Sequence, residues 1–219
     1  MIIKMKTLMF IATILFVLIF QVGCGSTVST TQETVSEVKD TVELQAGEKV
    51  IYFAGGCFWG TEKLFSDFPG ISSVTSGYAN GHVANPTYEQ VCQNMTGARE
   101  TVRVIYNPAQ IKLTTLLDVY FAVIDSTVTN RQGADVGSQY QTGTYYSDEA
   151  DAPIIEAAAE KERAKHKAFA VEIKPLSNFY KAEEYHQHYL DKNPGGYCHI
   201  TLKEFEEARK IVTDANRNQ

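Results

Sequence analysis

A run of thirteen residues near the start of the chain, 8–20, is apolar except for one threonine, and two lysines precede it. The run is too short for a comfortable membrane span, but its length and positive flank are typical of a signal-peptide core. Residues 1–24 are therefore predicted to be a targeting segment. Residues 25–48 are polar, lack apolar periodicity and are predicted to be a flexible tether. The fold must then be built from residues 49–215.

A cysteine closes the targeting segment. Gly23 stands directly before Cys24, and this pair resembles the processing site of a bacterial lipoprotein, at which the cysteine is acylated. Lipid on Cys24 would hold the protein at the outer side of a membrane. Gln21 departs from the usual pattern. A secreted or periplasmic protein with an ordinary signal peptide, or a retained anchor, therefore remains an alternative.

The rest of the chain has roughly 170 residues, enough for one domain with a buried core. Its composition excludes several classes. The 44% content of hydrophobic residues excludes a disordered chain. A formal net charge of −6 argues against a general nucleic-acid binder, because the phosphate backbone demands a basic face. Four cysteines without a CxxC pair fit neither a disulfide-stapled mini-domain nor a zinc framework.

Strands and helices alternate along this domain, and the strands are short and few. The patterns predict strands over residues 49–55, 73–79, 100–106, 141–146 and 170–174. They predict helices over residues 57–66, 88–93, 114–124, 150–167, 181–190 and 203–214. This order favours a two-layer α+β sandwich, with one sheet covered by helices and a largely irregular C-terminal segment, over a doubly wound fold.

One cysteine stands where a predicted strand gives way to a predicted helix. The strand ends at a pair of glycines, and Cys57 opens the helix. Free N–H groups and partial positive charge at a helix N-terminus stabilise a thiolate, so the pKa of Cys57 is expected to fall. Phe58 and Trp59 would form an apolar wall beside the sulfur. The pattern alone leaves a buried structural cysteine as the alternative.

Five ordered blocks extend this pattern along the chain. They are GCFWG at 56–60, NPTYE at 85–89, TGARE at 96–100, NRQGADVGSQY at 130–140 and a C-terminal block that ends in GYC at 196–198. Together they resemble the A-type peptide-methionine sulfoxide reductases (MsrA). The resemblance implies a ferredoxin-like, split β-α-β core, and reduction of the S epimer of methionine sulfoxide, free or in proteins. It implies no metal and no organic cofactor.

The resemblance also implies a role for each matching residue. Cys57 would be the nucleophile that attacks the sulfoxide sulfur. Glu100 would be an acid, kept protonated by an apolar pocket, that gives its proton to the departing oxygen. Tyr88 and Tyr140 would hold that oxygen through their hydroxyls. Asp135 would act through water or the substrate backbone.

Attack at sulfur leaves a sulfenic acid on Cys57, which a second thiol converts into a disulfide. Cys198 lies in a late, Gly-rich segment and matches a resolving position of the family. The resemblance therefore implies a Cys57–Cys198 disulfide, recycled by thioredoxin or a thioredoxin-like reductant. Phe58 and Trp59 would receive the methyl group on the substrate sulfur. Cys92 is interpreted as a structural thiol, and a monomer is expected.

Three other functions are compatible with parts of the sequence. His186, His188, Cys198 and His199 suggest a metal site, but histidines two residues apart on a helix point to different faces. A cysteine protease would use Cys57 with a distant histidine and would need no second cysteine. A lipid-anchored surface protein could display a binding domain without catalysis.

Overall fold

The computed structural model describes residues 42–217, so the predicted targeting segment and Cys24 lie outside the described residues. Its helices and strands, in chain order, are β1 (Lys49–Ala54), α1 (Phe58–Ser66), β2 (Ile71–Ala79), α2 (Tyr88–Cys92), β3 (Arg99–Tyr106), α3 (Leu113–Val123), β4 (Arg131–Gln132), β5 (Asp135–Val136), the 3-10 turn η1 (Ser138–Tyr140), β6 (Gly143–Tyr146), the 3-10 turn η2 (Glu149–Asp151), α4 (Ala152–Arg163), β7 (Glu172–Pro175), β8 (Phe179–Lys181), α5 (Tyr189–Lys192) and α6 (Leu202–Arg217). None of the helices among these residues combines the length and apolar character that a membrane crossing requires.

Six strands form the central sheet in the order β7-β6-β1-β3-β2-β8. All neighbours pair antiparallel except β6 and β7, which are parallel and joined through α4. Strands β1 and β2 are connected by α1 and separated by β3, which runs opposite to both. Strands β3 and β6, connected by α3, enclose β1 in the same way. The predicted α+β class with a split β-α-β core is confirmed.

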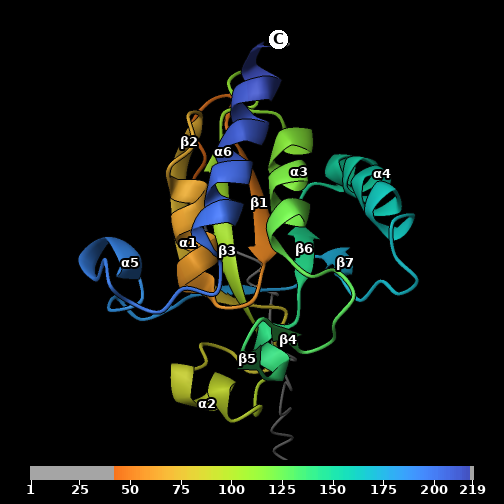
Figure 1. Cartoon of the computed structure of the whole chain (residues 1–219). Helices are drawn as coiled ribbons and strands as arrows, with labels where there is room; N and C mark the ends of the chain where they lie inside the picture. Colours follow the sequence, from red (N-terminus) through yellow and green to blue (C-terminus); the bar gives the residue numbers. More distant parts are fainter. Residues whose placement is uncertain (1–41, 218–219) are drawn as a thin grey trace, which may run out of the picture. The chain divides into compact units, whose positions relative to one another are not determined.

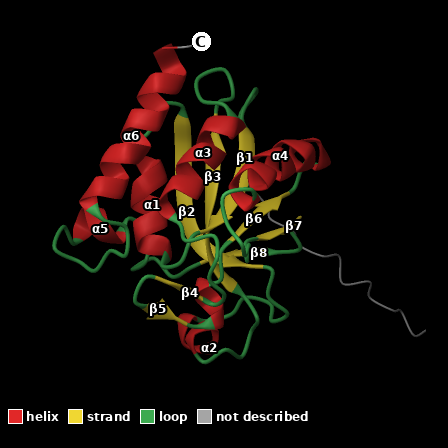
Figure 2. Cartoon of the chain, turned by 45° about the vertical axis from the view of Figure 1, so that its right-hand side comes forward, coloured by secondary structure: helices red, strands yellow, loops and turns green. Residues whose placement is uncertain are grey.

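Helices α1, α3 and α6 cover one face of the sheet (Figures 1 and 2). Alternation along β1 explains this layering, because successive side chains of a strand point to opposite faces. Phe53 faces the helices and stacks on Phe65 of α1 and Tyr120 of α3, with ring centroids 4.8 and 4.9 Å apart. Its neighbour Tyr52 belongs to a smaller core on the other face, where its ring meets Phe179.

The segment that follows β7 differs most from the expectation. The predicted helix over residues 181–190 is wrong, because the chain first adds β8 to the edge of β2 and then turns before the short α5. The side chain of Gln187 explains the difference. It accepts a hydrogen bond from the backbone N–H of Ser76 at 3.0 Å and donates to the carbonyl of Ser76 at 2.9 Å. These bonds hold the segment against the sheet and satisfy backbone groups that a helix would leave unpaired there.

Two further predictions need smaller corrections. The loop predicted over residues 131–139 contains the β4–β5 hairpin, and the helix predicted over 150–167 is divided into η2 and the shorter α4. In Figure 1 the hairpin and α2 gather beyond the end of the sheet at which β1 stops. That end of the sheet carries the candidate site.

Candidate active site

Cys57 is the N-cap residue of α1, directly after the turn that ends β1. Gly56 provides this turn with a left-handed φ of 88°, which favours glycine. The Cys57 side chain is nearly buried, with 6% of its surface exposed. The backbone N–H groups of Trp59 and Gly60 in the first turn act on its sulfur and lower the pKa of the thiol, although the side chain makes no capping hydrogen bond. The helix thus begins one residue later than predicted, and the thiol faces its free N–H groups.

The expectation that the helix N-terminus lowers the pKa of Cys57 is wrong for the protein without substrate. Burial raises the pKa of the thiol most strongly, and the negative charge of Glu100 acts in the same direction. The N–H groups of Trp59 and Gly60 lower the pKa but do not offset the burial. Cys57 is therefore a neutral thiol at pH 7. When Glu100 is protonated, the Cys57 thiol no longer faces the negative charge that opposes its ionisation more than any other charge does.

Glu100 lies in β3, and 1% of it is exposed. Burial raises the pKa of this carboxyl to about 8, although Oε2 accepts a hydrogen bond from the backbone N–H of Phe58 at 3.1 Å. The charge of Asp135 acts in the same direction as burial and contributes to this value. The other oxygen, Oε1, is buried and has no hydrogen-bond partner among the described residues. Glu100 is thus a neutral acid at pH 7, anchored through one oxygen to the residue that follows Cys57.

Two tyrosine hydroxyls from different segments interact electrostatically with this carboxyl. Tyr88 is the first residue of α2, and Tyr140 is the last residue of η1. Burial raises the pKa of both hydroxyls, and the charge of Glu100 raises the pKa of both further. The charges of Cys57 and Asp135 also act on Tyr140. Both tyrosines therefore stay protonated and can donate hydrogen bonds to an oxygen atom held near Glu100.

Phe58 and Trp59 belong to an aromatic cluster around the buried His186. The ring centroids of Phe58 and Tyr88 lie 4.9 and 4.4 Å from that of His186. Trp59 donates from Nε1 to Nδ1 of His186 at 3.0 Å and stacks on Tyr189 at 3.8 Å. Burial lowers the pKa of His186, so a neutral imidazole accepts the Trp59 bond. The cluster gives the site a rigid apolar wall beside the thiol.

Glu183 joins this wall to the sheet. Its Oε2 accepts a hydrogen bond from the hydroxyl of Tyr78 at 2.7 Å, and its Oε1 accepts one from the backbone N–H of Tyr88 at 2.9 Å. Burial alone would raise the pKa of Glu183, but these bonds outweigh it and lower the pKa. Sequence reasoning gave Glu183 no role. Its place in the C-terminal block was the only available signal.

Cys198 lies against the first turn of α1. A Cβ atom on Gly60 would stand 3.0 Å from the Cys198 sulfur and 3.1 Å from Nδ1 of His199. The absence of a side chain at Gly60 therefore makes room for both residues. Cys57 and Cys198 are free thiols. The structure thus places the second cysteine close to the helix turn that Cys57 caps.

Asp135 reaches the thiol from the β4–β5 hairpin, and His199 reaches it from the segment before α6. One oxygen of Asp135, one ring nitrogen of His199 and the Cys57 sulfur lie within 4.8 Å of one another. Sequence reasoning considered His199 only as part of a metal site with His186 and His188. The structure separates these histidines, since His186 is buried in the aromatic cluster and His188 is exposed.

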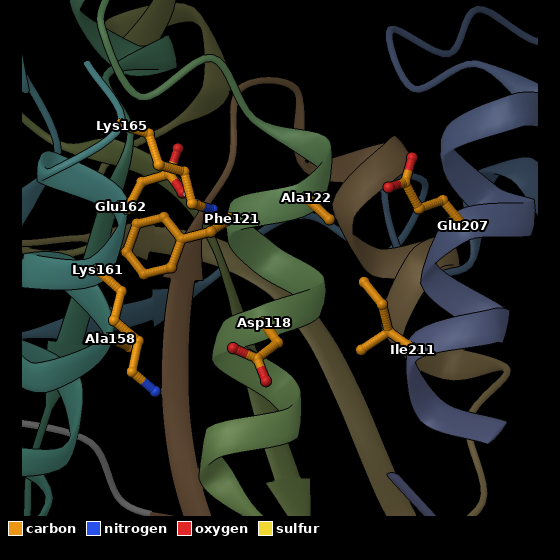
Figure 3. Close-up of a pocket in the computed structure, with 9 residues that line it drawn as sticks. All are labelled: Asp118, Phe121, Ala122, Ala158, Lys161, Glu162, Lys165, Glu207 and Ile211. Atoms are coloured by element: carbon orange, nitrogen blue, oxygen red, sulfur yellow. The ribbon is translucent and has the colours of Figure 1, made fainter. Parts of the chain in front are cut away.

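Other features lie at or beyond the margin of the site. Cys92 ends α2 and forms a hydrogen bond with the side chain of Tyr88. A pocket of about 380 Å³ lies among α3, α4 and α6 (Figure 3). Charged groups such as Asp118, Lys161 and Glu207 line it, together with Phe121. None of the predicted site residues is part of that lining.

Comparison with known proteins decides the family. A model of the peptide methionine sulfoxide reductases matches residues 49–217. The chain is 54% identical over 162 residues to peptide methionine sulfoxide reductase MsrA of Lachnoclostridium phytofermentans, covering 74% of this chain and 98% of that protein. The chain belongs to the MsrA family of peptide methionine sulfoxide reductases. The MsrA of Clostridium acetobutylicum is 53% identical over 153 residues, which cover 69% of this chain and 94% of that protein.

Two solved structures resemble this one. Mxr1 of Saccharomyces cerevisiae in its reduced form is 38% identical, with a TM-score of 0.70, over 74% of this chain and 97% of that chain. Methionine sulfoxide reductase A of Corynebacterium diphtheriae is 37% identical, with a TM-score of 0.66, over 74% of this chain and 82% of that chain. The likeness confirms the fold and the family assignment that the five sequence blocks predicted.

Proposed function

We propose that this chain reduces the S epimer of methionine sulfoxide, free or in proteins, to methionine, and so repairs oxidised proteins. Family membership supports the reaction class. Glu100 supports the chemistry in this chain, because it is a buried carboxyl with a pKa of about 8. It is hydrogen-bonded to the residue after Cys57. A neutral acid beside a thiol meets the main difficulty of the reaction, since the sulfoxide oxygen leaves only after protonation.

In the proposed first step, the Cys57 sulfur attacks the sulfoxide sulfur while Glu100 protonates the oxygen. Tyr88 and Tyr140 donate hydrogen bonds to that oxygen, and their support grows as charge develops on it. The aromatic cluster holds the methyl group of the substrate. The S–O bond of the substrate breaks, and the oxygen adds to the Cys57 sulfur as hydroxide while the bond between the two sulfurs breaks and its electron pair stays on the substrate sulfur. The products are methionine, reduced by two electrons, and a Cys57 sulfenic acid, oxidised by two electrons. The proton of the thiol returns Glu100 to its neutral form.

In the proposed second step, the Cys198 thiol attacks the sulfenic sulfur of Cys57 and releases water, leaving a disulfide. A thioredoxin or thioredoxin-like dithiol then reduces this disulfide. A structure of Mxr1 in complex with Trx2, 29% identical to this chain with a TM-score of 0.50, supports such a partner. Cys198 lines a groove of about 440 Å³ with apolar residues including Ile200 and Phe205, through which a reductant can reach it.

The Cys198→Ser variant tests the second step. We expect one methionine formed per enzyme in a single turnover, because Cys57 and Glu100 are intact, and no continued turnover with thioredoxin. Methionine released in a quenched-flow experiment measures the first quantity, and oxidation of NADPH coupled through thioredoxin reductase measures the second. Cys92→Ser is the matched control and should retain both. Full thioredoxin-supported turnover in Cys198→Ser would contradict the role assigned to Cys198.

An epimer-resolved assay tests the function as a whole. The purified protein is incubated with a peptide containing both epimers of methionine sulfoxide and with dithiothreitol, and chiral separation follows each epimer. We expect loss of the S epimer alone. Cleavage of the peptide would favour the cysteine protease. Loss of activity on adding a chelator would favour a catalytic metal, and no change in the peptide would favour a binding protein.

We also propose that Cys24 is acylated and anchors a monomeric protein at the outer side of a membrane. The sequence supports this through the apolar run at 8–20 and through Gly23 before Cys24. Labelling cells with a fatty acid that carries an alkyne should mark the wild-type chain but not Cys24→Ala. Release of the unlabelled wild-type chain into the medium or periplasm would favour the secreted alternative.

A further inference from the structure

The groups around the Cys57 thiol form a mixed set of sulfur, nitrogen and oxygen ligands. The Cys57 sulfur, one oxygen of Asp135 and one ring nitrogen of His199 lie within 4.8 Å of one another. Zinc bonds to such atoms are about 2.0–2.3 Å long, which places tetrahedral ligands roughly 3.5 Å apart. Coordination of one ion would draw the three atoms from within 4.8 Å to that spacing. This arrangement fits a divalent cation with one coordination position left open.

The orientation of His199 supports this reading. Its Nε2 lies 2.8 Å from the carbonyl oxygen of Gly55. A carbonyl only accepts hydrogen bonds, so Nε2 carries the hydrogen and Nδ1 carries the free electron pair. Nδ1 is buried and has no hydrogen-bond partner in the described part of the chain. Histidines that bind metals are held in this way, with the second ring nitrogen donating to a carbonyl or a carboxylate.

Asp135 also carries an unpaired atom. Its carboxylate interacts with the hydroxyl of Tyr197 and raises the pKa of that hydroxyl. Its Oδ2 is buried and has no hydrogen-bond partner within residues 42–217. The proposed reduction gives neither Oδ2 nor Nδ1 of His199 a direct partner. Two buried, unpaired acceptor atoms on the residues that flank an ionisable thiol are suited to a cation, which also offsets the cost of a buried thiolate.

We propose that the reduced protein binds one Zn²⁺ ion through Cys57, Asp135 and His199, and that the bound ion reversibly blocks the nucleophile. The blocking rests on the proposed function, whereas the binding does not. A set with a thiolate and an imidazole selects zinc over magnesium, which prefers oxygen ligands. Oxidation of Cys57 to a disulfide removes the sulfur ligand and releases the ion.

Calorimetric titration of the reduced, full-length protein with zinc chloride tests the site without any sulfoxide. We expect one ion per chain, with affinity about tenfold weaker or worse in His199→Gln and Asp135→Asn, and absent in Cys57→Ser. Cys92→Ser and Cys198→Ser should bind within about threefold of wild type, and magnesium should not compete. Retained affinity in His199→Gln, or loss in Cys198→Ser, would replace this site with a dithiol site and overturn the proposal.

A spectroscopic experiment on the wild-type protein tests the site without relying on variants that could misfold. Cobalt(II) added to the wild-type protein should produce the intense visible bands of a tetrahedral ion and a thiolate charge-transfer band. Pre-oxidation of the protein to the disulfide should abolish both. The weak absorption of six-coordinate cobalt would contradict the proposal, as would bands that persist after oxidation. Both experiments measure metal binding without any sulfoxide. A negative result in either would overturn the zinc proposal and would leave the proposed reductase function standing.

Discussion

The Cys57→Ser variant is expected to lose methionine sulfoxide reduction, with a fall in rate of roughly 10⁴-fold or more. A serine hydroxyl is a far weaker nucleophile than a thiol and forms no sulfenic acid. The fold should persist, because the two side chains are similar in size and serine is a favoured N-cap residue. Cys57 caps a helix whose interior side chains, among them Leu64 and Phe65, remain buried in the core.

The measurement is methionine release from an oxidised peptide at saturating dithiothreitol. Thermal unfolding of both proteins shows that the variant is folded. Cys92→Ser is the control for loss of a thiol near the site, and it should keep most of the activity. Reduction by Cys57→Ser at a rate comparable to that control would refute the nucleophile assignment.

The Glu100→Gln variant is expected to slow the first step by roughly 10²- to 10⁴-fold, the usual contribution of a general acid. Glutamine can still accept the hydrogen bond from the N–H of Phe58. It has no acidic proton to give to the sulfoxide oxygen. In the wild type, the single-turnover rate should fall as the pH rises through about 8, the pKa of Glu100. The variant should lack that limb of the profile, and an unchanged rate or profile would contradict the assignment.

The raised pKa of Glu100 also predicts that the stability of the protein depends on pH. Its pKa is raised from 4.5 in the unfolded chain to about 8 in the folded protein, so the folded state binds this proton more tightly. Its contribution to stability is fully present below pH 4.5 and is lost as the pH rises through about 8. We therefore expect Glu100→Gln to gain stability relative to wild type between about pH 6 and pH 9. Urea unfolding of both proteins at about pH 6 and pH 9 measures the free energy of unfolding. A variant that is less stable relative to wild type at about pH 9 than at about pH 6 would contradict this expectation.

The sequence predicted the features of the site that depend on local pattern. Cys57 was recognised because a strand, a glycine pair and a helix follow one another within a few residues. The burial of Glu100, and with it the neutral carboxyl, followed only from the family resemblance, since a glutamate at a strand start is usually exposed. The fold class also followed from the alternation of elements. Cys24 lies outside the described residues and stays a prediction.

The remainder depends on contacts between distant segments. The pKa of Cys57 was predicted with the wrong sign, because burial and the charge of Glu100 outweigh the N–H groups of the local helix. His199 stands out only after its ring nitrogens are placed against Gly55 and Asp135. The edge strand β8 replaced a predicted helix because Gln187 bonds to a strand more than a hundred residues earlier.

The site is assembled from distant parts of the chain. Cys57 lies at the β1–α1 junction, Glu100 lies in β3, and Cys198 lies in the segment just before α6. Contacts with such large sequence separations form late in folding, because the entropy of closing long loops must first be overcome. After dilution from denaturant, helix content should therefore return first. Competence to form the disulfide should return last, when the C-terminal segment docks. A chain whose C-terminal segment has not yet docked would therefore lack catalysis although its helices are formed.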